Sequence, residues 1–352
     1  MIGVDEELEE LLRDFFAGEV DPGLVDAVER TGAWPDHLWE KAARTQIPWI
    51  GIPETAGGVG GSLADVAALV QHAAFHATPL PLLEHHLAAH LLASAGLNRV
   101  DGPLTVAGLG TDPAPVLTNG RMSGSLGPVA WAQAAAAVVV LTRDSDRRDV
   151  VAVLEPGAAR AEPGRDLAGI PAPALMLDDV AVRAGVLPDV AAVRRRAEVL
   201  RCCALAGLLR RLYEITSTYA GERHQFGKPI GAFQAVQIHL VTLAQSASIA
   251  MVAVDRAVSA VASGGGDLES AATAVVVDEC AAQAAAAAHQ AHGAIGMTRE
   301  YPLQQITRRV HAWRQAWTPT AGIAERLGRA AHAAPSLAGL ITCHPDERIT
   351  TA

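Results

Sequence analysis

Residues Glu222–Gln234 read ERHQFGKPIGAFQ and lie between two long helical patterns. Ala- and Leu-rich patterns lead into it over roughly 197–220 and leave it over roughly 235–262, which predicts two long helices joined by a tight turn. Within the turn, Arg223 is a planar cation that suits a pair of phosphates, and Phe226 offers a ring face. These residue types alone favour a plain basic turn between two helices.

The composition limits the classes of protein that the chain can belong to. With 352 residues it is long enough for two or three domains, and its net charge of −10 argues against a nucleic-acid partner. The four cysteines show neither metal-ligand spacing nor a disulfide framework, so we expect reduced thiols and a cytoplasmic location. No signal-peptide pattern and no uninterrupted apolar run of about 20 residues stands out, so we expect no membrane association.

The periodicity divides the chain into four parts. Residues 1–100 carry helical patterns, and residues 101–187 carry short β-type runs near 103–108, 134–142, 149–154 and 175–182. These runs predict a small antiparallel sandwich or barrel. Residues 188–335 are again helical, with helices expected at roughly 192–221, 235–263, 267–292 and 302–330, which form a bundle. Residues 336–352 are predicted to be a mobile tail.

Two further sequence patterns could in principle bind a ligand, but we expect a ligand at neither of them. The glycine-rich loop at 57–61 lacks the Lys-Ser/Thr ending and the βαβ setting of a phosphate cradle, so we interpret it as a connector. The pairs His72/His76 and His86/His90 each lie on one side of a helix, because residues four apart share a helix face. The sequence places no third metal ligand beside them, so no metal site is expected.

The chain resembles the acyl-CoA dehydrogenase family at two motifs. Residues Arg223–Gln234 resemble the FAD signature of that family, and Gln290–Pro302, which reads QAHGAIGMTREYP, resembles its Gln-x-x-Gly-Gly-x-Gly loop about 65 residues later. The apolar-Pro-Glu segment before the glycine-rich loop also resembles the N-terminal domain of the family. The resemblance implies an α+β fold with an N-terminal helical domain (1–100), a middle β-sandwich or barrel (101–187) and a C-terminal four-helix bundle (188–335).

The resemblance also assigns a cofactor half-site. In this family each FAD lies between two subunits, and the segments matched here hold its pyrophosphate and adenine end. By resemblance, Arg223 pairs with the pyrophosphate, Phe226 contacts the adenine side, and Gln234 and Gln290 supply amide contacts. The glycines Gly293 and Gly296 keep their loop close to the cofactor, whereas the alanine between them, at 294, would crowd the backbone if a positive φ is needed there.

The other half of the family's site is eroded. The middle-domain motif that bonds the flavin ring is missing from the equivalent region, 106–115, and the later flavin-facing strand is expected at Ser123–Trp131. The family's catalytic base is absent too, because its two usual positions fall at Ala197 and at Trp317 or Thr318. Glu198 is a weak candidate, since it lies one step, or about 100°, round the helix from Ala197.

This pattern resembles the shorter, degenerate subunit of actinobacterial heterotetrameric (α2β2) acyl-CoA dehydrogenases. The resemblance implies a subunit without a base that completes the FAD site of a homologous catalytic partner during α,β-dehydrogenation of an acyl-CoA, with a steroid side-chain thioester suggested. An electron-transfer flavoprotein would then reoxidise the flavin.

Three alternatives stay open at this point. One is a self-sufficient homotetrameric dehydrogenase that uses Glu198 as its base. Another is a flavin monooxygenase of the same fold, whose oxygen chemistry needs no base at Trp317. The last is a structural partner with no cofactor contact, which the set Arg223, Phe226, Gln234 and Gln290 argues against.

Overall fold

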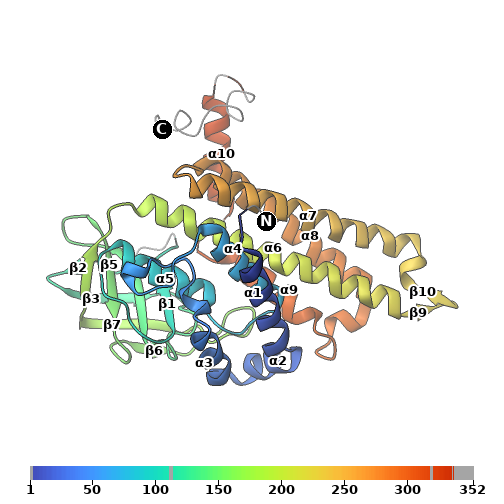
Figure 1. Ribbon diagram of the computed structural model, residues 1–352, viewed down its shortest axis with the longest axis horizontal. Coiled ribbons are helices and arrows are strands. Elements are labelled where there is room, and N and C mark those ends of the chain that lie inside the picture. Colours follow the sequence, from blue (N-terminus) through green and yellow to red (C-terminus); the bar gives the residue numbers. More distant parts are fainter. Residues whose placement is uncertain (1–2, 111–113, 318–319, 335, 337–352) are drawn as a thin grey trace. The chain divides into compact units, whose positions relative to one another are not determined.

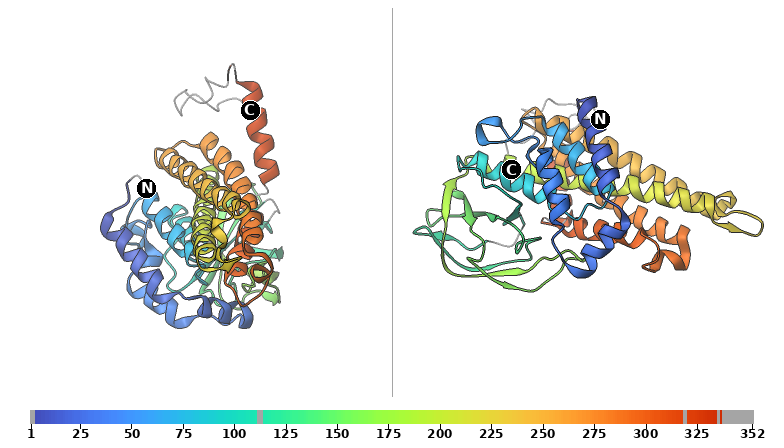
Figure 2. Two further views of the ribbon diagram at one scale, coloured as in Figure 1. Left: turned by 90° about the vertical axis from the view of Figure 1, so that its right-hand side faces the viewer. Right: turned by 60° about the horizontal axis from the view of Figure 1, so that its bottom comes forward.

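The computed structural model describes residues 3–110, 114–317, 320–334 and 336. Thr318 and the predicted tail from residue 337 onward therefore lie outside the described residues. The chain divides into two compact units (Figures 1 and 2). The first comprises Met1–Phe16, Val70–Ala77 and Glu198–Ala352, and the second comprises Ala17–Leu69 and Thr78–Ala197.

The N-terminal hundred residues are helical, as the sequence predicts. The five helices of this part are α1 (Glu6–Glu19), α2 (Pro22–Thr31), α3 (Asp36–Arg44), α4 (Leu63–Phe75) and α5 (Leu82–Ser94), with short 3-10 turns η1 (Ile47–Trp49) and η2 (Glu54–Ala56). Local capping fixes where helices begin. The carboxylate of Asp21 accepts from the N–H of Leu24 at 2.9 Å, and Ser62 and Asp65 cap one another at the start of α4.

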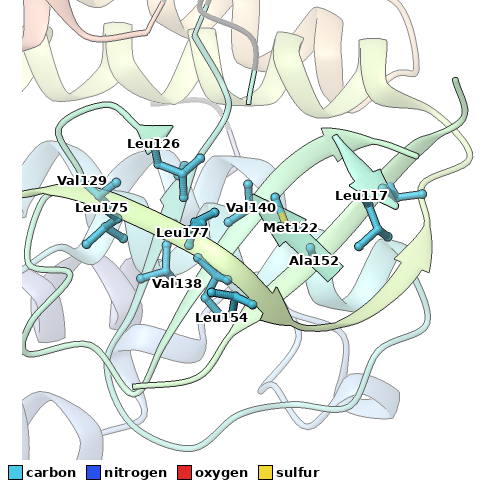
Figure 3. Packing of buried hydrophobic residues seen from close by; sticks show 13 residues of the cluster. Leu117, Met122, Leu126, Val129, Val138, Val140, Ala152, Leu154, Leu175 and Leu177 are labelled. Carbon is cyan, nitrogen blue, oxygen red and sulfur yellow. The ribbon is translucent and has the colours of Figure 1, made fainter. Parts of the chain in front are cut away.

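The middle part is a sandwich of two four-stranded sheets. The first sheet has the order β1-β4-β5-β8 and the second β2-β3-β7-β6. Branched side chains of β4 and β5 and the inward residues of β3 and β7 fill the space between the sheets (Figure 3). The strands are β1 (Leu104–Ala107), β2 (Leu117–Thr118), β3 (Arg121–Leu126), β4 (Ala137–Arg143), β5 (Asp149–Leu154), β6 (Arg160–Glu162), β7 (Ala174–Ala181) and β8 (Arg183–Val186).

Two expectations for this sandwich are wrong in detail, and three of its strands were not expected. The pairing is not wholly antiparallel, because β1 and β4 run parallel from Leu104↔Ala137 onward. The strand expected at Ser123–Trp131 ends at Leu126, because Gly127 and Pro128 follow and proline cannot donate to a ladder. The short strands β2, β6 and β8 were not predicted, since two to four residues carry little alternating pattern.

The C-terminal part is built on long helices. These are α6 (Val190–Glu222), α7 (Gln234–Ala262), α8 (Asp267–His292), α9 (Leu303–Gln315) and α10 (Thr320–Ala333). The antiparallel helices α7 and α8 lie side by side (Figures 1 and 2). The buried positions of α8 are mostly alanine, which lets neighbouring backbones approach closely. The helix expected over 302–330 is wrong: α9 ends at Gln315, and Trp317 has a positive φ of 61°.

The two histidine pairs are held by local contacts. Nε2 of His72 lies 2.8 Å from a carboxylate oxygen of Glu9, and the rings of His86 and His90 stack at 6.2 Å. No group of three metal-ligating side chains occurs in the part of the chain that the structure describes.

By length and composition, two of the described helices are long and apolar enough to cross a membrane. They are α7 and the segment Asp267–Met297. Length and composition alone are weak grounds, because the core helix of a soluble protein passes the same test.

Candidate functional site

The segment after α6 forms a two-residue β-hairpin. Strand β9 (His224–Gln225) pairs with β10 (Lys228–Pro229), and the turn consists of Phe226 and Gly227. Both turn residues have positive φ, 50° and 79°, as a type I′ turn requires. Glycine adopts this backbone freely, whereas an aromatic residue is strained in it. Phe226 is nevertheless 93% exposed, so no described residue compensates for this strain by burying its ring.

Arg223 is fixed by its backbone and free at its side chain. Its N–H donates to the carbonyl of Tyr219 at 2.9 Å, and its carbonyl accepts from the N–H of Ile230 at 2.8 Å. The exposed guanidinium makes no hydrogen bond or ion pair with any described residue. A planar cation held at a rigid base and left without an anion is suited to a phosphate pair.

The second motif follows α8. Gln290 is exposed on the last turn of α8, and Gly293 begins the 3-10 turn η4 (Gly293–Met297) with φ of 63° and open space around it. Gly296 differs, because a Cβ there would lie 2.8 Å from Cβ of His292 and 2.9 Å from Cδ2 of Leu303. Packing therefore explains Gly296 by itself, and its contact with a cofactor stays a prediction.

The alanine that replaces the family's second glycine causes no strain. Ala294 is not among the residues with positive φ, so its Cβ meets no backbone conflict. The crowding expected at this position is therefore absent from the structure.

An aromatic cluster joins the two motifs. The rings of Tyr219 and His292 stack at 4.4 Å, and Tyr301 lies 4.9 Å from His292 and 5.4 Å from Tyr219. The hydroxyl of Tyr301 also donates to the carbonyl of Ile215. Burial lowers the pKa of His292, which keeps this imidazole neutral within the stack. Sequence reasoning missed these three residues, although Tyr219 precedes Arg223 by one helical turn.

Chain topology brings the two motifs to the same end of the bundle. The antiparallel course of α7 and α8 returns the last turn of α8 to the end where α7 begins, and the β9–β10 hairpin projects beyond this end (Figure 1). Gln234 is exposed on the first turn of α7, and Phe233 just before it has its ring 6.1 Å from that of Phe226. The two predicted amide donors and the hairpin thus share one end of the structure.

The region expected to hold a base contains Glu198. This side chain is mostly buried, and its Oε1 lies 3.7 Å from Nη2 of Arg201 without a hydrogen bond. Burial raises the pKa of Glu198, against the opposing charges of Arg201 and Arg326. Arg201 in turn donates to the carbonyl of Trp313 at 3.1 Å, which places Glu198 near the C-terminal turn of α9.

The two other base positions carry no acid. Ala197 is buried, and the Trp317 ring packs edge-on against that of Trp313 at 6.1 Å. On the ring side of the expected flavin site, Trp131 is buried against Trp34 at 5.1 Å and so belongs to the core. Residues 111–113 of the loop after β1 lie outside the described residues.

The residues present fit one end of a dinucleotide. An unpaired guanidinium suits a pyrophosphate, an exposed ring suits an adenine, and two exposed amides offer both donors and acceptors. The chemistry of these side chains therefore fits the phosphate and adenine end of FAD.

Two domain models of one protein family match this chain. Residues 4–100 match the acyl-CoA dehydrogenase N-terminal domain, and residues 195–316 match the acyl-CoA dehydrogenase C-terminal domain. The chain belongs to the acyl-CoA dehydrogenase family. Acyl-CoA dehydrogenase IpdE2 of Mycobacterium tuberculosis is 29% identical to this family member over 329 residues, which cover 91% of this chain and 95% of that protein.

Solved structures of the family share the fold. A variant of the Tcur3481-Tcur3483 steroid acyl-CoA dehydrogenase superimposes with a TM-score of 0.83 at 25% identity, covering 92% of this chain and 96% of that one. The ChsE4-ChsE5 complex from Mycobacterium tuberculosis gives a TM-score of 0.87 at 22% identity, covering 95% of this chain and 99% of that one. The α+β organisation expected from the sequence is thereby confirmed.

Proposed function

We propose that this acyl-CoA dehydrogenase family member is the subunit that lacks a catalytic base and completes the FAD site of a homologous catalytic subunit in an α2β2 complex. The reaction would be α,β-dehydrogenation of an acyl-CoA thioester in the cytoplasm, with a steroid side chain as the acyl class. Two similar structures support this proposal. The Tcur3481-Tcur3483 structure is described as a steroid acyl-CoA dehydrogenase, and ChsE4-ChsE5 is described as a complex.

The observation that carries the proposal is the exposed hairpin. Arg223 has no anionic partner in the described chain, and Phe226 holds a strained turn with its ring in solvent. Strain of this kind persists where surrounding structure or a ligand over-determines it. A cofactor held partly by another chain supplies both the missing anion and the missing cover.

Each residue then has a defined task. When bound, FAD supplies the acceptor for the hydride that leaves the β-carbon of the acyl group. Arg223 would neutralise the pyrophosphate through charge-assisted hydrogen bonds, and Phe226 would cover the adenine. Gln234 and Gln290 would orient the adenine end through their amides, while Gly293 and Gly296 would let the loop backbone approach it.

The outer face of α7 has exposed apolar side chains that a partner chain would cover. Four apolar side chains, Ile238, Val241, Ile249 and Val252, are half exposed or more and recur on one side of the helix. Only 22% of the most apolar window of α7 is buried inside this chain. A surface of this kind is typical of an interface, and a homologous subunit of the same fold would cover it with its own helices.

The absence of an acidic residue at the position expected for the base supports a base supplied by the partner subunit. No Asp or Glu occurs between Glu300 and Glu325, so the end of α9 cannot place a carboxylate over a substrate. The catalytic carboxylate would come from the partner, and an electron-transfer flavoprotein would accept the electrons. The buried free thiols of Cys202, Cys203 and Cys280 fit a reducing cytoplasm.

The proposal predicts a dependence of flavin content on the partner. Purified alone and desalted, the chain should show no flavin absorbance at roughly 450 nm. The reason is that donors to only one end of a cofactor bind it weakly. Co-expressed with the homologous catalytic subunit, it should give a yellow complex with one flavin per pair of unlike chains and a native mass equal to two of each. A visible spectrum and native mass spectrometry measure both quantities. A yellow homotetramer of this chain that oxidises acyl-CoA by itself would refute the proposal.

A second candidate function rests on Glu198. Its Oε1 accepts no hydrogen bond and its pKa is raised, and both properties favour a general base in a self-sufficient dehydrogenase. Against this, Glu198 faces Arg201 and Arg326, whose charges draw it into a structural ion pair.

Replacement of Glu198 separates the two functions. Under the proposed function, Glu198→Gln in the complex should leave kcat within about twofold, because the base belongs to the partner. If Glu198 is the base, kcat should fall by roughly 10²–10⁴-fold. Glutamine has nearly the same size and shape as glutamate, so the fold should persist, as near-UV circular dichroism would check.

A further inference from the structure

A half-buried arginine near the start of α6 lacks an anionic partner. Nε and Nη2 of Arg196 lie 3.2 and 3.1 Å from Nε2 of His86. A neutral imidazole offers one acceptor lone pair, so these two donors share it, and the proton of His86 must then reside on Nδ1. Nη1 of Arg196 makes no hydrogen bond or ion pair with any residue that the structure describes. Charged groups withdrawn from water are normally paired, because an uncompensated charge is costly there.

The neighbouring histidines extend this cluster. His86 is fully buried and stacks on His90 with ring centroids 6.2 Å apart and planes 10° apart. His90 is half-buried, and its ring nitrogens have no hydrogen-bond partner among the described residues. Burial lowers the pKa of His86 far below its usual value and that of His90 to about 3, and the Arg196 charge acts in the same direction. Both imidazoles are therefore neutral at pH 7, and each still carries one N–H donor.

No carboxylate of a described residue forms an ion pair with Arg196 or a hydrogen bond with His86 or His90. Among the described residues, no carboxylate contributes to the pKa shifts of Arg196, His86 or His90. Burial lowers the pKa of Arg196 to about 10, because withdrawal from water disfavours the charged form. The backbone of Gly51 lies close to His86, because a Cβ there would be 3.3 Å from Cε1 of the imidazole. The cluster is thus cationic, rich in donors and partly open.

We propose that Arg196, His86 and His90 form a binding site for an oxyanion, the carboxylate or phosphate group of a small molecule. Nη1 of Arg196 would donate a charge-assisted hydrogen bond, and the free N–H of His90 would donate a second one. His86 acts as a positioning residue, because it fixes the plane of the guanidinium. The bound anion supplies the counter-charge that the chain itself omits. This inference is independent of the proposed dehydrogenation and of FAD.

The experiment titrates the purified full chain with inorganic phosphate and, separately, with glutarate, at constant ionic strength. The melting temperature of the wild type should rise by about 3 °C or more, saturably, with at least one of the two anions. Arg196→Met should abolish the rise. This variant should fold, because an apolar side chain of similar length replaces an uncompensated cation. Arg194→Met is the matched control, since Arg194 is exposed two residues away, and it should respond like the wild type.

The two anions identify the source of the ligand group. A rise with phosphate alone assigns the site to a phosphate group, as on a nucleotide, and a rise with glutarate alone assigns it to a carboxylate on an acyl chain. His90→Gln should weaken either response by roughly tenfold in apparent Kd, as expected for one lost donor. The inference is overturned if neither anion stabilises the wild type, or if the rise persists in Arg196→Met. Calorimetric titration of the same variants gives a second readout free of unfolding.

Discussion

Replacing Arg223 with methionine should weaken FAD binding by the complex roughly 100-fold. The guanidinium has no partner within the described chain, so its donors are free for the pyrophosphate. A hydrogen bond to a charged group contributes about 1.5–3 kcal/mol, and a bidentate guanidinium makes two of them. A net loss of about 3 kcal/mol corresponds to this factor, because every 1.4 kcal/mol changes an equilibrium constant tenfold.

The measurement is equilibrium dialysis of the apo-complex against FAD, followed by flavin fluorescence. Arg223→Lys should recover part of the affinity, since it keeps the charge and loses the planar fork. Lys228→Met is the matched control, because Lys228 is a cation on the same hairpin whose ammonium faces the Phe233 ring at 4.3 Å. Unchanged FAD affinity in Arg223→Met, with the hairpin intact, would show that the cofactor does not reach this motif.

Long helices were predictable because their signals are local. The ranges 192–221 and 235–263 expected from the alanine and leucine pattern agree with α6 and α7 to within about two residues. The break between α9 and α10 was missed because the pattern continues through it. The sequence signal that could have predicted a break is the proline at 319, since proline disfavours the continuation of a helix.

Strand pairing was not predictable from the same patterns. Leu104 and Ala137 are partners in a parallel pair, and no property of either segment encodes its partner or direction. The glycine-containing strand β3 carries little alternation, yet it pairs with β7 through a register shift between Met122 and Gly124. Pairing of this kind arises from the tertiary core rather than from local propensity.

Some features of the candidate site could also be predicted from local sequence, whereas others depend on tertiary contacts. The sequence motifs nominate Arg223 and Gln290, and the antiparallel helices place both motifs at one end of the bundle. The motifs do not predict the positive φ of Phe226 or the burial of Glu198, because both depend on neighbours distant in sequence. The contact between Arg196 and His86 joins residues 110 positions apart, so no spacing rule reveals it.

Gly207→Ala should lower the free energy of unfolding by about 3 kcal/mol. Glycine inside a helix usually costs about 0.5–1 kcal/mol relative to alanine, so at an open position the same replacement stabilises. At Gly207 on α6, a Cβ would lie 2.3 Å from the carbonyl oxygen of Gln71 on α4, and 3.1 Å from its carbonyl carbon. Gln71 is fully buried, and a backbone atom cannot rotate away as a side chain can. The helices must therefore separate.

A second glycine of the same helix decides whether this contact is real. A Cβ at Gly221 would meet nothing within 4 Å, so Gly221→Ala should raise stability by about 0.5–1 kcal/mol. The two substitutions should shift the urea midpoint of unfolding in opposite directions, as measured by circular dichroism at about 222 nm. Equal gains in both variants would contradict the close approach of α4 and α6. Opposite shifts would mean that this helix-interior glycine, a weak point by propensity alone, is what allows the two helices to pack.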